Sequence, residues 1–425
     1  MDQASLLTLE LPYGKEKIEI KIPKSNLVGV FSPQPIPAVN DPVDEISDAL
    51  SNPLGSLPIH GFIKPGKKVV ILIDDHTRTT PASLILPHLL DQLHNAGIHK
   101  DHMTIMVTHG THRLSTDEEV LEKLGNSVYA GYRIEQHICS DESNQTFLGL
   151  TSRGTPVWIN KLVVQSDYRI GIGHIGPSPY AGYSGGYKLI VPGVASLDTI
   201  NSNHSLVPLG LGKHGNTELP CRLDLEEAAK MIGMDMVIDV VLSQEEKILK
   251  IFAGKPESVF TEGLKLARDV YEVDFLNQVD IVVSSATPYD LDLYQAIRAI
   301  EYADAVVKPG GSILLLAACP DGIGGNDFYQ LVADQQKRPE DFLRDVTRRT
   351  GMVTFSVLGH TLASIKADKQ IHIISDGISS SDLREMGFNT PVSLQSGLDM
   401  LIDQYGHHAK IAVFPIGATT IPIVK

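Results

Sequence analysis

Short apolar segments alternate with amphipathic segments along most of the chain. KKVVILIDD (67–75), MTIMVTH (103–109) and YRIGIG (168–173) have the length and composition of buried strands. Residues 79–97 between the first two have helical spacing, with Pro81 near the predicted first turn and Gly97 after the end. This alternation predicts α/β architecture with mostly parallel sheets.

The same pattern extends to both ends of the chain. Helices are also predicted over 115–125, where Ser115 and Glu118 are spaced as a capping box, and over 224–233, capped by Asp224. A hairpin is predicted over 5–23. A second strand–helix series starts near residue 279 and comprises strands 279–288, 310–320, 370–377 and 410–417, with helices over 293–307 and 339–351. We therefore expect one domain over 1–274, completed by the C-terminal strand 409–425, and a Rossmann-like α/β domain over 275–408.

Length, charge and cysteine content exclude several classes of protein. The 425 residues suffice for two or three domains with sizeable cores, and no apolar run is long enough to span a membrane. The net charge of −15 argues against a nucleic-acid partner. The three cysteines, Cys139, Cys221 and Cys319, form no CxxC pair, and the N-terminus does not resemble a secretory signal. We expect a cytoplasmic protein.

Polar residues follow three of the predicted strands. The first strand runs into Asp74-Asp75-His76-Thr77-Arg78, the second into His109-Gly-Thr-His112-Arg113, and the third into His174. Ligands of open α/β sheets bind beyond the carboxyl ends of the strands. The sequence therefore predicts a site at this edge of a sheet.

Two glycine-rich segments resemble nucleotide-binding loops but depart from their patterns. Gly171-x-Gly173-x-x-Gly176 matches GxGxxG, but the prolines at 177 and 179 disfavour the helix that a dinucleotide fold requires. Ala181-Gly-Tyr-Ser-Gly-Gly-Tyr-Lys188 is no P-loop, because Leu189 stands where a magnesium-binding hydroxyl belongs. Its glycines suit an anion, and its lysine is a point charge, a nucleophile or a solvated surface residue.

Together these motifs resemble the nickel-dependent lactate racemase family. The resemblance rests on Asp75-His-Thr-Arg78, Gly110-Thr-His112-Arg113, the 181–188 loop, His204 and Tyr294-Gln295-x-x-Arg298. It implies two α/β domains with the active site in the cleft between them. The implied cofactor is a nickel-pincer nucleotide, pyridinium 3,5-bisthiocarboxylic acid mononucleotide with nickel, covalently attached to Lys188. Nickel is then held by one pyridinium carbon, two sulfurs and His204, a donor set that suits square-planar nickel(II).

The resemblance also implies a reaction and a set of roles. A histidine takes the hydroxyl proton of a 2-hydroxy acid while the C2 hydrogen leaves as hydride to the cofactor, and the keto acid then rotates and regains hydride on its other face. His112 is the implied first base. Cofactor contacts are implied for Lys188, Asp75, Thr77, Arg78, Gly185 and Gly186, and substrate contacts for Arg78, Ser178, Tyr294, Gln295 and Arg298.

Two positions depart from the family pattern. Arg298 stands in place of a family lysine, which keeps the charge but changes the geometry of carboxylate binding. Ser178 stands ten residues before Lys188, where family lactate racemases carry the second catalytic histidine. Either His174 supplies the second base, His112 serves both faces, or the chain is inactive as a racemase. Because serine is smaller than histidine, the pocket could admit a longer, hydroxylated acid such as an aldonate.

Three functions compete on the sequence alone. A racemase or C2-epimerase of a 2-hydroxy acid is favoured, with a sugar acid preferred over lactate and with cofactor-biosynthesis proteins as necessary partners. A catalytically silent binder of an anionic metabolite would need neither Lys188 nor His204. An NAD-dependent oxidoreductase would need a helix that Pro177 disfavours.

Overall fold

The computed structural model describes residues 6–210 and 212–425, and the chain divides into two compact units. The first comprises residues 35–210 and 216–270 and contains a six-stranded sheet. The second comprises residues 1–34, 211–215 and 271–425 and contains a five-stranded sheet. We call them the six-stranded unit and the five-stranded unit.

The sheet of the six-stranded unit has the order β13-β12-β9-β4-β5-β6. Its members are β4 (Val69–Asp74), β5 (Met103–Thr108), β6 (Arg133–Gln136), β9 (Tyr168–His174), β12 (Met236–Leu242) and β13 (Ile248–Gly254). All neighbours are parallel except β13, which pairs antiparallel with β12. The expectation of mostly parallel sheets is confirmed, whereas the hairpin β12–β13 was not predicted.

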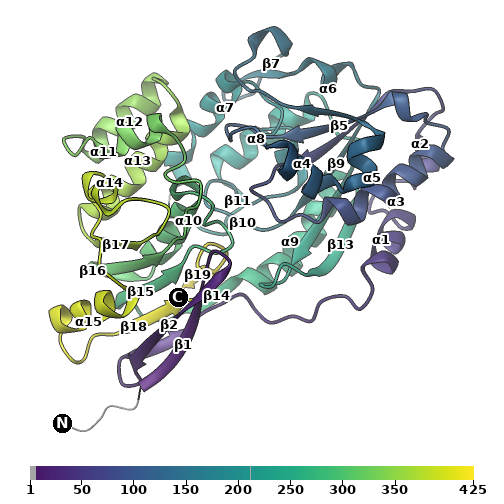
Figure 1. Cartoon of the computed structure of the whole chain (residues 1–425). Helices are drawn as coiled ribbons and strands as arrows, with labels where there is room; N and C mark the ends of the chain where they lie inside the picture. Colours follow the sequence, from purple (N-terminus) through teal and green to yellow (C-terminus); the bar gives the residue numbers. More distant parts are fainter. Residues whose placement is uncertain (1–5, 211) are drawn as a thin grey trace. The chain divides into compact units, whose positions relative to one another are not determined.

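Alternate residues of the buried strands pack against helices on opposite faces of this sheet (Figure 1). Ile71 and Ile73 of β4 face one core, with α1 (Pro42–Ser51), α3 (Ala82–Asn95), α4 (Asp117–Leu124) and α5 (Asn126–Gly131). Val70 and Leu72 face the other, with α6 (Lys161–Gln165), α7 (Leu197–His204), α8 (Pro220–Lys230) and α9 (Pro256–Tyr271). Because both faces are covered, the strands are continuous apolar runs.

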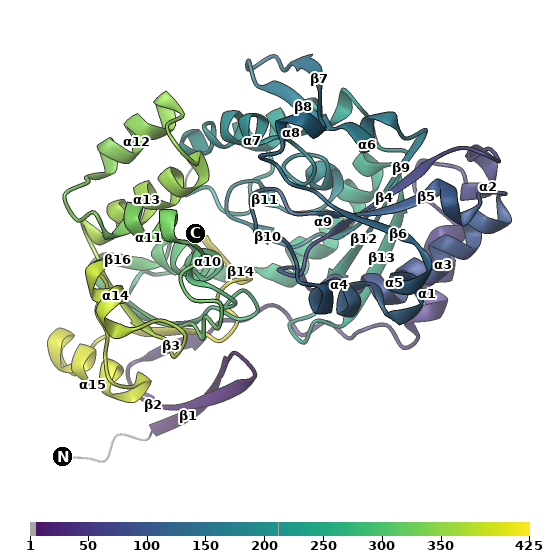
Figure 2. The same ribbon diagram turned by 45° about the horizontal axis from the view of Figure 1, so that its top comes forward.

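Short elements complete the six-stranded unit. The hairpin of β7 (Gln145–Leu150) and β8 (Pro156–Asn160) lies beside α7, as Figure 2 shows. The ribbon of β10 (Pro177–Ser178) and β11 (Gly182–Tyr183) follows β9. The remaining elements are α2 (Ile59–Phe62), η1 (Lys100–His102), η2 (Glu142–Asn144), η3 (Gly186–Leu189) and η4 (Val207–Gly210).

The sheet of the five-stranded unit is parallel throughout, in the order β17-β16-β15-β18-β3. Its strands are β3 (Leu27–Val30), β15 (Val279–Ser285), β16 (Val307–Leu316), β17 (Gln370–Ile374) and β18 (Ile411–Phe414). Leu11 and Ile20 of the hairpin β1 (Leu6–Tyr13)–β2 (Glu16–Pro23) share a core with Ile281, Val283 and α15 (Leu394–Tyr405). The other elements are α10 (Leu293–Asp304), α11 (Asn326–Ala333), α12 (Pro339–Arg348), α13 (Val353–Lys366), α14 (Ser380–Glu385), β14 (Glu272–Phe275) and β19 (Ile421–Val424).

The expected domain limits need correction. Residues 1–34 and the C-terminal strand 409–425 belong to the five-stranded unit, not to the domain expected over 1–274. Pairing explains this result, because β3 forms the edge of the five-stranded sheet beside β18, and β19 pairs with β14. Segments distant in sequence thus pair within this unit, β3 in the five-stranded sheet and β19 in a separate two-stranded sheet.

Two predicted helix caps are also wrong. The capping box of α4 uses Thr116 and Glu119, not Ser115 and Glu118, with Thr116 Oγ1 accepting from the Glu119 amide at 3.2 Å. Helix α8 begins at Pro220, so Asp224 lies inside it and accepts hydrogen bonds from buried hydroxyls instead of capping the N-terminus. Among the described helices, none combines the length and apolarity needed to cross a membrane.

Candidate active site

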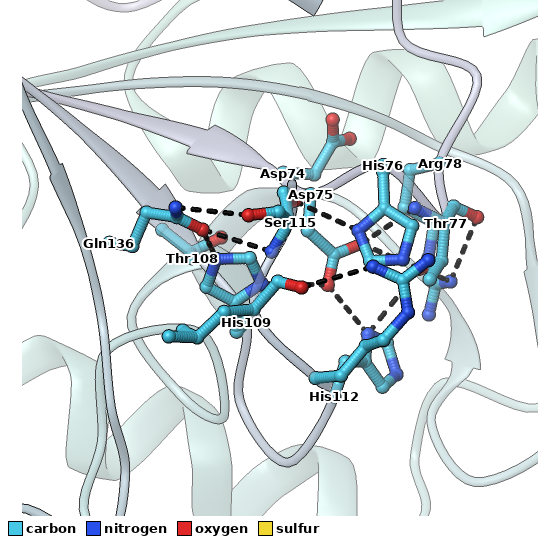
Figure 3. A network of polar contacts seen from close by, with 12 residues as sticks. Asp74, Asp75, His76, Thr77, Arg78, Thr108, His109, His112, Ser115 and Gln136 are labelled. Carbon is cyan, nitrogen blue, oxygen red and sulfur yellow. Dashed lines mark hydrogen bonds and ion pairs between the residues drawn. The ribbon is translucent and has the colours of Figure 1, made fainter. Parts of the chain in front are cut away.

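The loops after β4, β5 and β9 meet at one edge of the six-stranded sheet. These three parallel strands are neighbours, so their carboxyl ends lie side by side. Strand β4 ends at Asp74 and is followed by Asp75, β5 runs into the loop that carries His109 and His112, and β9 ends at His174. Figure 3 shows the polar network that results from the first two loops. The convergence expected from the sequence is confirmed.

His112 is held by a buried carboxylate. Its Nδ1 lies 2.7 Å from Asp75 Oδ2 (Figure 3). Burial raises the pKa of Asp75, but the charges of His112 and Arg78 and the hydrogen bond from His112 outweigh it, so the pKa is well below the ordinary value. An ionised Asp75 accepts the Nδ1 proton of His112 and thereby selects the tautomer whose Nε2 carries a lone pair. His112 is therefore oriented as a proton acceptor.

The turn after Asp75 fixes Arg78. Thr77 donates its backbone N–H and its hydroxyl to Asp75 Oδ1, at 3.0 and 2.6 Å. The Arg78 guanidinium donates to Thr77 Oγ1 at 2.6 Å and to the Thr77 carbonyl at 3.1 Å. Lys123 of α4 donates to the Arg78 carbonyl at 2.7 Å. A cationic guanidinium is thus positioned beside Thr77 and close enough to Asp75 to lower its pKa, and such a group suits a carboxylate or phosphate.

His174 forms a second imidazole–carboxylate pair, with Asp74. Its Nδ1 lies 3.4 Å from Asp74 Oδ2 and 3.2 Å from Thr80 Oγ1, and Thr80 donates to the same carboxylate oxygen. Burial raises the pKa of Asp74, but Lys123, whose Nζ lies 2.6 Å from Asp74 Oδ1, and His174 outweigh it and lower the pKa. Burial lowers the pKa of His174, so this ring is neutral at neutral pH.

Lys188 lies in the glycine-rich loop beside Ser178. Its Nζ donates to Ser178 Oγ at 3.0 Å. Gly185 has φ of +87°, and a Cβ there would lie 2.6 Å from Ile175 Cγ1 and 2.9 Å from Asp239 Oδ2. The Gly186 amide donates to Asp239 Oδ2 at 2.7 Å. The loop therefore approaches the core too closely for a larger residue at 185.

Asp239 is a buried acid beneath this loop. It lies on β12, and burial raises its pKa to about 7, with a lowering contribution from the Gly186 amide. Sequence reasoning overlooked this residue, although a lone carboxylate within an apolar strand is a recognisable signal of a buried polar contact.

Asp239→Asn should change how stability depends on pH. The acid titrates near 3.8 when unfolded and near 7 when folded, so between these pH values only the folded state binds its proton. The free energy of unfolding of the wild type should fall by about 1.4 kcal/mol per pH unit over this window, relative to the variant. Urea unfolding at pH 4.5, 6 and 7.5 measures the free energy of unfolding of the variant minus that of the wild type, which should increase with pH. A constant difference would contradict the assignment.

His204 ends helix α7 and is partly buried. Burial lowers its pKa to about 3, with smaller contributions from the charges of Lys188 and His112. Its ring meets that of Tyr180 edge-on, with centroids 5.8 Å apart. The imidazole is therefore neutral at pH 7, the state that a metal ligand requires.

The remaining predicted residues lie on α10 of the five-stranded unit. Asp292 caps this helix by accepting from the Gln295 amide at 2.7 Å. Arg298 donates to Gln295 Oε1 at 2.7 Å and stacks over Tyr289 at 3.8 Å, which confirms that residues 295 and 298 share a helix face. The Tyr294 ring packs edge-on against Phe328 and Phe355.

Comparison with known proteins identifies the family. The models of the lactate racemase N-terminal domain and the lactate racemase C-terminal domain match residues 13–212 and 275–422. The chain belongs to the lactate racemase family. Membership makes it an isomerase of the racemase class.

Individual relatives agree over the full length. The lactate racemases of Lactiplantibacillus plantarum and Thermoanaerobacterium thermosaccharolyticum are each 29% identical over 98% of this chain and 100% and 99% of theirs. The structure of the lactate racemase apoprotein from the latter organism covers 98% of this chain and 100% of its own, with 28% identity and a TM-score of 0.88. A Thermotoga maritima protein shares the fold at 17% identity, covering 90% of this chain and 98% of its own, with a TM-score of 0.73.

The structure divides the predicted site residues between the two units. Asp75, Thr77, Arg78, His112, His174, Ser178, Lys188 and His204 all lie in the six-stranded unit, whereas Tyr294, Gln295 and Arg298 lie in the other. Lys123 and Thr80, which hold Asp74, were not predicted. Lys123 follows the ordinary pattern of a polar helix face, so no sequence signal marks it.

Proposed function

We propose that the chain is a racemase or C2-epimerase of a 2-hydroxy acid that works with a lysine-tethered nickel-pincer nucleotide. The observation that carries the proposal is the pairing of His112 with the ionised Asp75, beside Arg78. An oriented base and a fixed guanidinium are what the hydroxyl and the carboxylate of such an acid require. The named relatives of the chain are lactate racemases.

The donor groups of the six-stranded unit fit this cofactor. Lys188 offers an amine for the covalent link, and His204 is neutral at pH 7 and so offers a nitrogen lone pair to nickel. The loop at Gly185 and Gly186 brings backbone N–H groups close together, which suits a phosphate. Asp75, Thr77 and Arg78 would make further contacts.

The residues then have distinct tasks. Arg78 binds the substrate carboxylate, with Gln295, Tyr294 and Arg298 proposed as further substrate contacts. His112 takes the hydroxyl proton on Nε2, and the ionised Asp75 stabilises the imidazolium that forms. When bound, the cofactor supplies a reversible acceptor for the C2 hydrogen as hydride. The proton returns from a histidine to the oxygen once the keto acid has turned its other face.

His174 is the proposed second base. Its Nδ1 lies 3.4 Å from Asp74 Oδ2, and that of His112 lies 2.7 Å from Asp75 Oδ2, so each ring has a carboxylate beside it, the closer one at His112. Ser178 occupies the position of the family's second catalytic histidine and accepts from Lys188. A serine there leaves more room beside the lysine, which favours a longer hydroxylated acid such as an aldonate over lactate.

Ser178→His should shift the substrate preference toward lactate. The larger imidazole fills the space next to Lys188 and adds a base, so the ratio of kcat/KM for lactate to kcat/KM for an aldonate should rise by at least about tenfold, a change of ~1.4 kcal/mol. Ser178→Thr is the matched control, since it adds only a methyl group. An unchanged ratio would count against the proposed role of this position.

The function itself is tested by C2 inversion in deuterated water. Enzyme co-expressed with the cofactor-biosynthesis proteins is incubated with single enantiomers of lactate and with aldonates, and the products are separated by configuration. We expect inversion with retention of the original C2 hydrogen, because that hydrogen moves as hydride and not as an exchangeable proton. Deuterium at C2 would contradict the mechanism, and absence of any inversion would favour a silent binder.

A further inference from the structure

Asp75 lies in a cluster of metal-ligating atoms together with two histidines that play no part in the proposed reaction. One ligand atom each from Asp75, His76 and His109 lie within 4.8 Å of one another. His109 is 2% exposed, and the His76 side chain is 6% exposed. The cluster contains neither Lys188 nor His204, so it is not the nickel site proposed above.

Both imidazoles present a nitrogen without a hydrogen-bond partner among the described residues. These atoms, His76 Nε2 and His109 Nδ1, are buried. His109 Nδ1 lies 3.6 Å from Asp75 Oδ2, too far for a strong hydrogen bond but suited to a cation between them. Unpaired buried nitrogens are costly unless something binds them.

The opposite nitrogens are held by one shared support (Figure 3). His76 Nδ1 lies 2.8 Å from Ser115 Oγ, and His109 Nε2 lies 2.8 Å from Gln136 Oε1. Gln136 exchanges hydrogen bonds with the backbone of Ser115, at 3.0 and 3.1 Å, which fixes Oε1 as an acceptor. His109 Nε2 must therefore carry hydrogen, so that neutral His109 has its lone pair on Nδ1. Outer contacts of this kind orient the histidines of metal sites.

We propose that Asp75, His76 and His109 form a binding site for a divalent cation of the zinc class. Two imidazoles and one carboxylate are a common protein ligand set for zinc, with water completing the coordination. Arg113, whose positive charge acts on His76, would oppose a bound cation. Its charge is offset by Glu119, to which the guanidinium donates two hydrogen bonds at 2.7 and 2.8 Å. A cation bound to Asp75 would compete with His112 for this carboxylate, so that its binding inhibits the racemase. This consequence rests on the proposed function.

Zinc binding to the full chain, purified without the nickel cofactor, tests the site. Zn²⁺ is titrated against a chromophoric chelator, and Co²⁺ serves as a probe with visible absorption. We expect one tight equivalent of Zn²⁺. His76→Ala and His109→Ala should each weaken it by at least about 100-fold, and Gln136→Ala by about 10–100-fold, as for lost outer contacts.

Two matched controls separate this site from others. His99→Ala removes an exposed histidine that lies 3.2 Å from Asp101, and His204→Ala removes the proposed nickel ligand. Both should keep the tight equivalent. Absence of tight binding to the wild type, or loss of binding only in the two control variants, would overturn the proposal. Circular dichroism checks that each variant is folded. If either histidine variant unfolds, the zinc affinity of Gln136→Ala and the zinc stoichiometry of the wild type decide whether the site exists.

Inhibition is measured on the cofactor-loaded enzyme. Zn²⁺ should reduce racemisation at least tenfold, a chelator should restore it, and His76→Ala should make the remaining activity insensitive to Zn²⁺. Zinc bound at these three residues without inhibition would overturn the regulatory consequence. An enzyme inactive before zinc is added would instead contradict the proposed function, because the binding measurement does not depend on turnover.

Discussion

Replacing His112 by glutamine should lower kcat/KM for the preferred 2-hydroxy acid by about 10²–10⁴-fold, the usual loss for a positioned general base. Glutamine keeps the approximate volume and a hydrogen-bond donor toward Asp75 but cannot take a proton at neutral pH. The effect should be mainly on kcat, because Arg78 still binds the carboxylate. Racemisation followed by chiral chromatography measures it.

The same substitution at His174 distinguishes the two proton-transfer schemes. If His174 is the second base, His174→Gln should cause a loss of the same order as His112→Gln. If His112 serves both faces, His174→Gln should lower kcat/KM by less than about tenfold, because the loss of a positioned base lowers it by more. Asp75→Asn should reproduce much of the loss of kcat/KM seen in His112→Gln. The carboxylate lies 2.7 Å from His112 Nδ1 and selects the His112 tautomer with a lone pair on Nε2, which an amide does not do. Full activity in His112→Gln would contradict the assignment of the base.

Replacing Lys188 should abolish racemisation altogether. The proposed chemistry needs an acceptor for the C2 hydrogen, and the chain offers Lys188 as the only proposed point of covalent attachment. Lys188→Arg keeps the positive charge beside Ser178, which Lys188 contacts at 3.0 Å, but its guanidinium does not form the covalent link proposed for the lysine amine. Lys188→Ala removes both charge and link.

Equal inactivity of the two Lys188 variants identifies the link, and not the charge, as the essential feature. Lys161→Ala, at an exposed lysine of the same unit, is the matched control and should retain full activity. Substantial activity in Lys188→Arg would show that the amine is needed only as a cation. It would also favour a cofactor held without a covalent bond.

Local patterns predicted β4, β5 and β9 and the loops that carry the site, but not the strands β12 and β13 of the same sheet. The apolar runs before Asp74, His109 and His174 became adjacent parallel strands, so their polar ends met as expected. Cap positions were less well predicted, because Ser115 and Thr116 both precede a suitably spaced glutamate. Tertiary contacts decide between them, since Gln136 binds the backbone of Ser115 and leaves Thr116 to cap α4.

Long-range pairing was the feature that the sequence did not predict. Residues 27–30 form the edge strand beside β18, almost 400 residues away, and no local pattern encodes that partner. The residues that hold the site residues in place were not predicted for the same reason. Lys123 reaches Asp74 from a helix, and Asp239 lies beneath the glycine loop from β12, so each depends on packing between elements distant in sequence.

The most direct test of the central claim is the intact mass of the protein after co-expression with the cofactor-biosynthesis proteins. Lys188→Ala and Lys188→Arg, prepared in the same way, are the controls. The account predicts an added mass equal to that of the linked nickel-pincer nucleotide in the wild type and none in either variant. An unmodified wild-type mass, in cells whose biosynthetic proteins load a known lactate racemase, would contradict the covalent cofactor.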